Sequence, residues 1–175
     1  MLLTFSEFET QEGCGMTLEE LHQRLQTLED IEAIKKLKVR YCHCADARDH
    51  VGFANLFIDD GVWEGGVFGH GEGWKGIEQF LRNVQEQSLP FALHYVMNAV
   101  VEVEGDTAVG QWYLLEPCTM TLADGRQTQA VWGTATYEDH FVKVNGEWKF
   151  KKVHLKPVFW SPFDQGWAKQ RFIQE

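Results

Sequence analysis

Apolar residues recur every three or four positions along the early part of the chain. Thr17 and Glu20 form a capping-box signature, which marks the start of a helix. This spacing predicts one long amphipathic helix, or two helices with a bend near Asp30. The periodic positions are Leu18, Leu21, Leu25, Leu28, Ile31, Ile34, Leu37, Tyr41 and Ala45.

Shorter elements are expected after this helix. Residues 51–57 predict a short helix that ends at Asp59-Asp60-Gly61, and residues 62–68 predict a strand. The glycine cluster at 69–73 predicts a turn, because a phosphate-binding loop needs a Lys-Ser/Thr ending and a helix directly after the glycines. Residues 75–87 predict a third helix, with Ile77, Phe80, Leu81 and Val84 on one face.

From residue 91 the pattern changes to long strands separated by tight turns. Asp124-Gly125 and Asn145-Gly146 are strong hairpin signals, and Glu104-Gly105-Asp106 is expected to form a three-residue loop. Helices followed by an antiparallel meander indicate an α+β fold, with about three N-terminal helices against one face of a strongly curved, mostly antiparallel sheet. The expected strands are 91–103, 107–121, 127–143 and 147–160.

Hairpin registers bring candidate chemical groups together. A three-residue first loop places His94 opposite Glu116, with Cβ atoms about 5 Å apart on one face. The second hairpin places Tyr137 opposite Trp112, and the third places His154 opposite Tyr137. These residues would give one concave face two imidazoles, a carboxylate and aromatic walls, as expected of a small-molecule site.

The end of the long helix is rich in groups that move protons, namely Tyr41, His43, Asp46, Asp49 and His50. We expect it to form one half of an active site, with His94 in the other half. Proton transfer needs only a positioned base and a polarising donor. The histidines and carboxylates have no metal-site spacing such as H-x-H or H-x-x-E-H, and no Ser or Cys stands in an elbow motif.

Composition narrows the class of protein. The chain has 175 residues, with 44% hydrophobic and 13% aromatic residues, which suffices for one packed domain. The net charge of −10 argues against nucleic acid or an anionic membrane as a partner. No apolar run approaches the ~20 residues of a membrane span. The N-terminus lacks the basic and apolar regions of a secretory signal.

Cysteine usage and chain ends complete this outline. The four cysteines are Cys14, Cys42, Cys44 and Cys118, and Cys42-x-Cys44 is not a zinc-ribbon spacing. We expect free thiols in a reducing cytoplasm. Residues 1–15 are expected to be a poorly ordered lead-in, 16–160 the domain, and 161–175 a tail that caps an opening or covers a neighbour.

Several stretches of the chain resemble one known family. They are M-T-L-E-E at 16–20, D-I-E-A-I-K-K-L-K at 30–38, Tyr41 with Asp46 five residues on, and W-Y-L at 112–114. They resemble the SnoaL-like branch of the NTF2-like superfamily, which includes scytalone dehydratase and, with the closest likeness, bile acid 7α-dehydratase. The resemblance implies a cone in which a curved sheet encloses a deep apolar pocket beside the end of the long helix.

The resemblance also implies roles for individual residues. His94 matches the catalytic histidine, Asp46 its carboxylate partner and Tyr41 the hydroxyl that binds the substrate oxygen. Glu116 falls where the bile acid enzymes carry an aspartate. Trp63 lies in a region where several members carry a tyrosine, and we assign it to substrate binding with Trp112, Tyr137 and His154. His43, Asp49 and His50 are then left to a solvated helix end.

The function implied is a cofactor-independent, metal-free lyase. His94, paired with Asp46, would remove a proton from an activated carbon, and water would leave from a hydrophobic, ringed substrate. Alternatives are a carbon–carbon lyase that releases formaldehyde from a hydroxymethyl-bearing phenolic compound, an isomerase, or a non-catalytic binding domain. The segment from Trp160 to Trp167 lies outside the family pattern and suggests an aromatic substrate. By analogy we expect a homo-oligomer formed through the outer face of the sheet, a trimer in preference to the alternative, a dimer.

Overall fold

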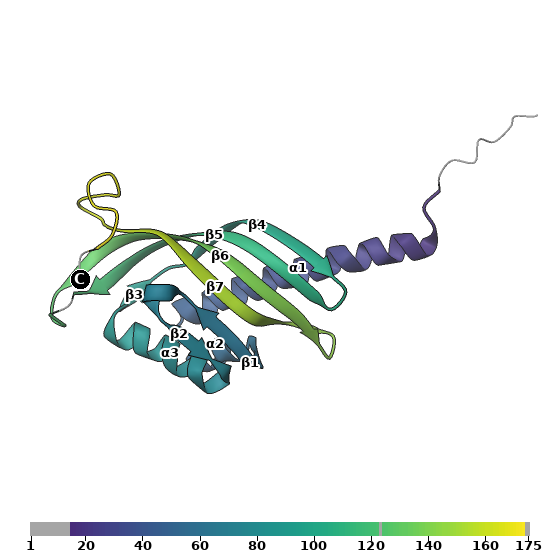
Figure 1. The fold of residues 1–175 in the computed structure, drawn as a ribbon, viewed down its shortest axis with the longest axis horizontal. Coiled ribbons are helices and arrows are strands. Elements are labelled where there is room, and N and C mark those ends of the chain that lie inside the picture. Colours follow the sequence, from purple (N-terminus) through teal and green to yellow (C-terminus); the bar gives the residue numbers. More distant parts are fainter. Residues whose placement is uncertain (1–14, 123, 174–175) are drawn as a thin grey trace, which may run out of the picture.

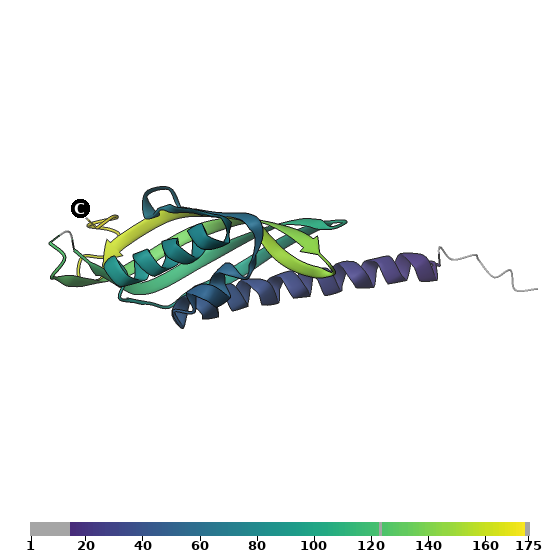
Figure 2. The same ribbon diagram turned by 90° about the horizontal axis from the view of Figure 1, so that it is seen from below.

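The structure is a computed structural model that describes residues 15–122 and 124–173. The lead-in expected at residues 1–15 lies outside these ranges except for Gly15, as does Cys14. Helices α1 and α3 lie on one face of a strongly curved sheet (Figures 1 and 2). The α+β class and the cone-like arrangement predicted from the sequence are confirmed.

The long helix is a single element, α1 (Leu18–Asp46). Thr17 caps it as predicted: the Glu20 backbone N–H donates to the Thr17 hydroxyl, and the Thr17 N–H donates to the Glu20 carboxylate at 2.8 Å. The C-terminal half buries Ile34, Leu37 and Tyr41. The N-terminal third runs past the rest of the molecule, as both ribbon views show.

The segments between α1 and the meander differ in part from the prediction. Helix α2 (His50–Ala54) ends sooner, and β1 (Phe57–Glu64) already contains Asp59-Asp60-Gly61. The predicted strand at 62–68 is therefore wrong beyond Glu64, because η1 (Gly66–Phe68) follows. The predicted glycine turn is also wrong: β2 (His70–Glu72) pairs with β1, and α3 (Gly73–Gln87) begins directly after it.

The long strands of the meander are close to those predicted. They are β3 (Phe91–Ala92), β4 (Tyr95–Glu104), β5 (Thr107–Thr121), β6 (Thr128–Val144) and β7 (Glu147–Pro162). The sheet order is β2-β1-β7-β6-β5-β3, and β4 also pairs with β5. Among the pairs of named strands in the described residues, only β1 and β7 run parallel. The first predicted strand is interrupted at Leu93 and His94, so His94 lies between β3 and β4.

The first hairpin reaches the predicted pairing by another route. Glu104 pairs with Thr107, so the loop has two residues rather than the predicted three. A bulge between Met97 and Val100 then shifts the register by one, and Asn98 has a positive φ of 56° there. Ala92 consequently pairs with Cys118 and Tyr95 with Leu115. This register brings His94 level with Glu116.

The other hairpins give one confirmed and one wrong pairing. Trp112 pairs with Tyr137 as predicted. His154 pairs with Glu138 rather than with Tyr137, whose partner is Leu155. A bulge at Lys151 adds one residue to β7, and a shift of one residue moves a side chain to the opposite face of a sheet. His154 therefore lies on the outer face, and its predicted place on the concave face is wrong.

An aromatic cluster fills the space between α1 and the sheet. The Tyr41 ring packs against Phe53 and Phe150, with centroids 4.6 and 5.5 Å apart. Phe57 and Phe141 extend this contact around Phe150. Cores packed this closely hold side chains in single positions. The cluster therefore fixes α1, and with it the groups at the helix end, against the sheet.

Candidate active site

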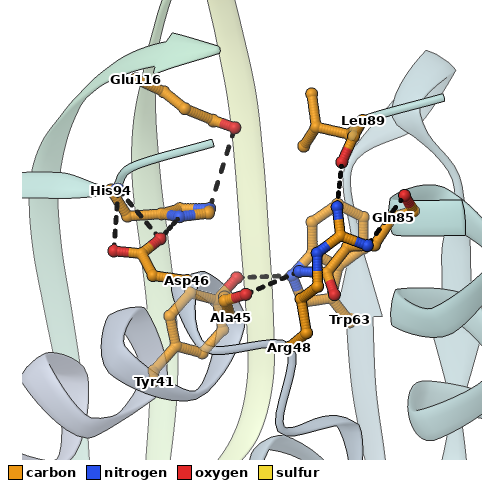
Figure 3. A network of polar contacts seen from close by, with 9 residues as sticks. All are labelled: Tyr41, Ala45, Asp46, Arg48, Trp63, Gln85, Leu89, His94 and Glu116. Carbon is orange, nitrogen blue, oxygen red and sulfur yellow. Dashed lines mark hydrogen bonds and ion pairs between the residues drawn. The ribbon is translucent and has the colours of Figure 1, made fainter. Parts of the chain in front are cut away.

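The last turn of α1 meets the break between β3 and β4. Asp46 is the final residue of the helix, and its Oδ1 lies 2.6 Å from His94 Nδ1 (Figure 3). The His94 backbone N–H lies 3.2 and 3.3 Å from the two carboxylate oxygens. One carboxylate thus contacts both the ring and the main chain of His94, so the orientation of the imidazole is fixed.

Glu116 faces the other side of the imidazole. Its Oε1 lies 3.9 Å from His94 Nε2, which is too long for a direct hydrogen bond. The Glu116 side chain is 6% exposed, against 12% for His94 and 21% for Asp46. The arrangement is a row of carboxylate, imidazole and carboxyl, in which only the first contact is a hydrogen bond.

The surroundings of His94 and Glu116 raise the pKa of both groups. Burial disfavours the imidazolium, but Glu116 and Asp46 outweigh it, so the pKa of His94 is raised above its usual value. Burial also raises the pKa of Glu116, although the nearby His94 opposes that shift. Groups whose pKa values are moved by burial and a specific partner are typical of functional sites.

Tyr41 lies one turn before Asp46 on α1, and its hydroxyl accepts a hydrogen bond from Trp63. The distance from Trp63 Nε1 to the Tyr41 oxygen is 2.8 Å, and the Trp63 ring stacks on Phe80 at 4.3 Å. Burial raises the pKa of Tyr41 well above its usual value. Tyr137 meets Tyr41 edge-on with centroids 6.0 Å apart. Tyr41 is therefore a neutral phenol whose oxygen is held by the Trp63 indole.

The structure thus gathers most of the residues predicted to form the site. Asp46, His94 and Glu116 form one row, and Tyr41 contacts both Trp63 and Tyr137. Trp112 is buried beside Tyr137 across the strand pair. His154 is separated from them by the sheet. A hollow of about 530 Å³ lies elsewhere, at the β4–β5 hairpin beside Glu102, and none of these residues lines it.

Sequence reasoning missed the residues that hold the two halves of the site together. Arg48, just after α1, donates to the backbone oxygens of Gln85, Leu89 and Pro90. Gln85 donates to the Ala45 oxygen at 2.6 Å and contacts His50 at 2.9 Å. His50 is therefore engaged with a buried amide, so its assignment to a merely solvated end is wrong. A lone arginine directly after a helix was the available signal.

A second buried pair lies deeper on the same helix and was also missed. Lys38 Nζ is 2.8 Å from Asp139 Oδ2, with side chains 1% and 0% exposed. The ammonium lies over the Tyr137 ring, 3.4 Å from its centroid. Burial lowers the pKa of Lys38, and Asp139 opposes that shift. The available signal was position: Lys38 lies three residues before Tyr41 and four after Ile34, on the buried face.

The described residues offer less support for a nucleophilic cysteine or a metal site. Burial raises the pKa of the Cys42 and Cys118 thiols to about 12, so neither forms the nucleophilic thiolate near neutral pH. Within residues 15–122 and 124–173, no three His, Cys, Asp or Glu side chains are grouped to hold a metal ion. Nor does any described helix combine the length and the apolar character that a membrane crossing requires.

Solved structures with the same fold include enzymes that carry out eliminations. LinA is 24% identical with a TM-score of 0.73, covering 87% of this chain and 99% of its own. The hexachlorocyclohexane dehydrochlorinase LinA-type3 of Novosphingobium barchaimii is 25% identical with a TM-score of 0.70, at the same coverage. A candidate scytalone dehydratase of Novosphingobium aromaticivorans is 22% identical with a TM-score of 0.65, covering 78% of this chain and 89% of its own.

The family match covers most of α1, the interruption between β3 and β4, and most of the sheet. Residues 26–154 match the SnoaL-like domain, a span that includes Tyr41, Asp46, His94 and Glu116. This match extends over well more than half of the chain. The chain therefore belongs to the SnoaL-like domain family, within the NTF2-like superfamily.

Proposed function

We propose that this protein is a cofactor-independent lyase that eliminates water from an apolar, ringed substrate. The observation that carries the proposal is the arrangement around one imidazole. Asp46 is bonded to Nδ1 at 2.6 Å, while Nε2 faces Glu116 at 3.9 Å. Nδ1 donates its proton to Asp46, so Nε2 of the neutral ring carries a lone pair. His94 is then the base, and Asp46 fixes its tautomer and stabilises the imidazolium that forms.

Glu116 is suited to the opposite role. Burial raises the pKa of Glu116, which favours the protonated carboxyl that could supply a proton to the departing hydroxyl. His94 Nε2 would take the proton from carbon, the carbon–oxygen bond would break with formation of a double bond, and Glu116 would complete the water molecule. Nε2 and Oε1 lie side by side, so the proton and the hydroxyl would leave from one face of the substrate. Transfer of the proton from His94 to Glu116 resets the site.

Tyr41 is the group best placed to bind the substrate oxygen. Its own oxygen already accepts the Trp63 N–H, so the phenol proton is available for donation. A neutral phenol in a dry site stabilises charge that develops on a carbonyl oxygen as the proton leaves. Trp63, Trp112 and Tyr137 would supply apolar walls for a ring. The similar structures named as a dehydrochlorinase and a candidate scytalone dehydratase support an elimination.

The test separates proton removal from loss of water. The protein is incubated in D₂O with a panel of ring-bearing β-hydroxy ketones, and NMR follows both exchange at the α-carbon and appearance of the alkene. His94→Ala should lose both signals by a factor of about 10² to 10⁴, the usual contribution of a general base. Glu116→Gln should retain α-carbon exchange and lose the alkene. His140→Ala, on the outer surface, is the matched control.

Two results would contradict the proposal. One is a wild-type protein that binds these compounds but neither exchanges nor dehydrates any of them, with His94→Ala binding them equally well. That pattern belongs to a non-catalytic binding domain. The other is turnover that EDTA abolishes and zinc restores, which would require a metal-dependent mechanism.

A further inference from the structure

The N-terminal third of α1 carries a row of leucines that stays exposed within the described part of the chain. Leu18, Leu21, Leu25 and Leu28 are 86%, 49%, 52% and 64% exposed. Both ribbon views show this part of the helix running beyond the tips of the β4–β5 and β6–β7 hairpins (Figures 1 and 2). Four exposed leucines on three turns of helix form an apolar surface, and exposing such a surface to water is unfavourable.

This row is not a continuation of the buried face of the helix. The sequence pattern predicted one long amphipathic helix, or two with a bend near Asp30. The buried positions Ile34, Leu37, Tyr41 and Ala45 form a stripe of their own. At about 100° per residue, the centres of the two stripes lie about 175° apart around the axis. The leucines therefore point away from the side on which the sheet of their own chain packs.

We propose that the leucine row is a contact surface for a second copy of this chain, whose α1 packs alongside in parallel. The intervals of three, four and three residues are those of the a and d positions of a heptad repeat, the seam by which helices of one sequence pair. This places Arg24 at a g position and Glu29 at the following e position. In a parallel pair these positions face each other across the seam.

Charge decides the orientation. In the parallel arrangement Arg24 of each copy meets Glu29 of the other, which gives two attractive pairs. In an antiparallel arrangement g positions face g positions, so Arg24 would meet Arg24. Within the described part of the chain, Arg24 contacts only the Met16 sulfur, at 3.3 Å, and Glu29 forms no ion pair. Both side chains are therefore available to a second copy.

The fold leaves room for two parallel α1 helices and already holds each of them in helical form. Because the two stripes face opposite ways, pairing through the leucines leaves the two domains on opposite outer sides, where they do not collide. Isolated helices of three turns are unstable in water. Here the exposed third is continuous with a helix anchored by Asp30, which contacts Lys143 and Trp148 Nε1. Its helical order is therefore largely established before association.

The seam has a defined end. The next two heptad positions are Glu32 and Lys35, which are charged, so the paired helices would diverge after Leu28. A seam of four leucines is short. It is consistent with association that depends on protein concentration.

The experiment is sedimentation velocity of the full-length protein over a wide range of concentration. Wild type should shift from the 20.2 kDa monomer to a dimer or larger assembly as concentration rises. Leu25→Glu should remain monomeric at every concentration, with unchanged far-ultraviolet circular dichroism. The matched control Gln23→Glu adds the same charge to the same turn on the opposite side, and should associate as wild type does.

A charge exchange keeps the test independent of the leucines. Arg24→Glu and Glu29→Arg should each associate more weakly than wild type, and an equal mixture of the two should recover association because every cross-pair is then attractive. A wild type that is monomeric throughout, a Leu25→Glu variant that assembles normally, or a mixture that fails to recover would each overturn the proposal. None of these outcomes bears on the proposed elimination.

Discussion

Two acid–base pairs involve α1, eight residues apart, and they differ in access to the surroundings. Lys38 and Asp139 lie 2.8 Å apart with 1% and 0% of their side chains exposed. Asp46 and His94 lie 2.6 Å apart with 21% and 12% exposed. The first pair is sealed between the middle of the helix and the sheet. The second lies where the helix ends and the neighbouring strand is interrupted.

This difference in access indicates which pair could exchange a proton with a substrate. A proton that moves in the sealed pair has no substrate to reach, so that pair can only specify how helix and sheet fit together. The open pair has a second face, at His94 Nε2, with Glu116 beyond it. We therefore expect the Lys38–Asp139 pair to serve the fold and the Asp46–His94 pair to serve the proposed reaction.

The largest effect is expected when the sealed pair is broken. Lys38→Met leaves the Asp139 carboxylate buried without a partner, which should lower the free energy of unfolding by about 3–5 kcal/mol. The double variant Lys38→Met/Asp139→Leu should recover most of that loss, because no charge is left buried. Urea denaturation at neutral pH measures both.

The control for this change is Lys36→Met on the exposed side of the same helix. Its ion pair with Glu32 is at the surface, with the lysine side chain 72% exposed, so the change should be within about 0.5 kcal/mol. A loss for Lys38→Met no greater than that for Lys36→Met would show that the two lysines do not differ as described.

The open pair should show the reverse balance between stability and activity. Asp46→Asn removes the charge that fixes the His94 tautomer, and we expect proton abstraction to slow by about 10². Stability should change little compared with Lys38→Met. Asp49→Asn is the matched control, because Asp49 instead caps α2 through Gly52 N–H at 2.8 Å. Equal rates in the two variants would contradict the assignment of Asp46.

The smallest expected effect is the pH dependence of stability. The folded-state pKa of His94 lies above the unfolded value of about 6.5, so its contribution to stability is present below pH 6.5 and is lost as pH rises through the folded pKa. The free energy of unfolding of wild type should therefore exceed that of Asp46→Asn by an amount that shrinks with rising pH. Urea denaturation across this pH range measures the difference. A difference that grows with pH has the wrong sign.

Local signals predicted much of this fold and part of the site. The capping box at Thr17 and the long strands could be read from nearby residues, and the hairpin turns fixed the confirmed Trp112–Tyr137 pair. Bulges could not be read in this way. The bulge near Asn98 compensated for a misjudged loop, so His94 still faces Glu116, whereas the bulge at Lys151 sent His154 to the outer face.

Long-range contacts were beyond the reach of the sequence pattern. Nothing near Lys38 indicates Asp139, which comes from a strand about a hundred residues later, and its neighbours Lys35 and Lys36 look alike but are solvated. The leucines from Leu18 to Leu28 likewise share the helical spacing of the positions that follow Asp30. Only the placement of the sheet shows that the stripe changes sides near Asp30.

The most direct measurement is NMR of the His94 ring in protein with ¹⁵N-labelled histidine, titrated through neutral pH in wild type and Asp46→Asn. We expect a pKa above the usual 6.5, and, above that pKa, a protonated Nδ1 beside an unprotonated Nε2. Asp46→Asn should lower the pKa and relax the tautomer. A proton on Nε2 in neutral wild type, or a pKa unchanged by the substitution, would contradict His94 as the base held by Asp46.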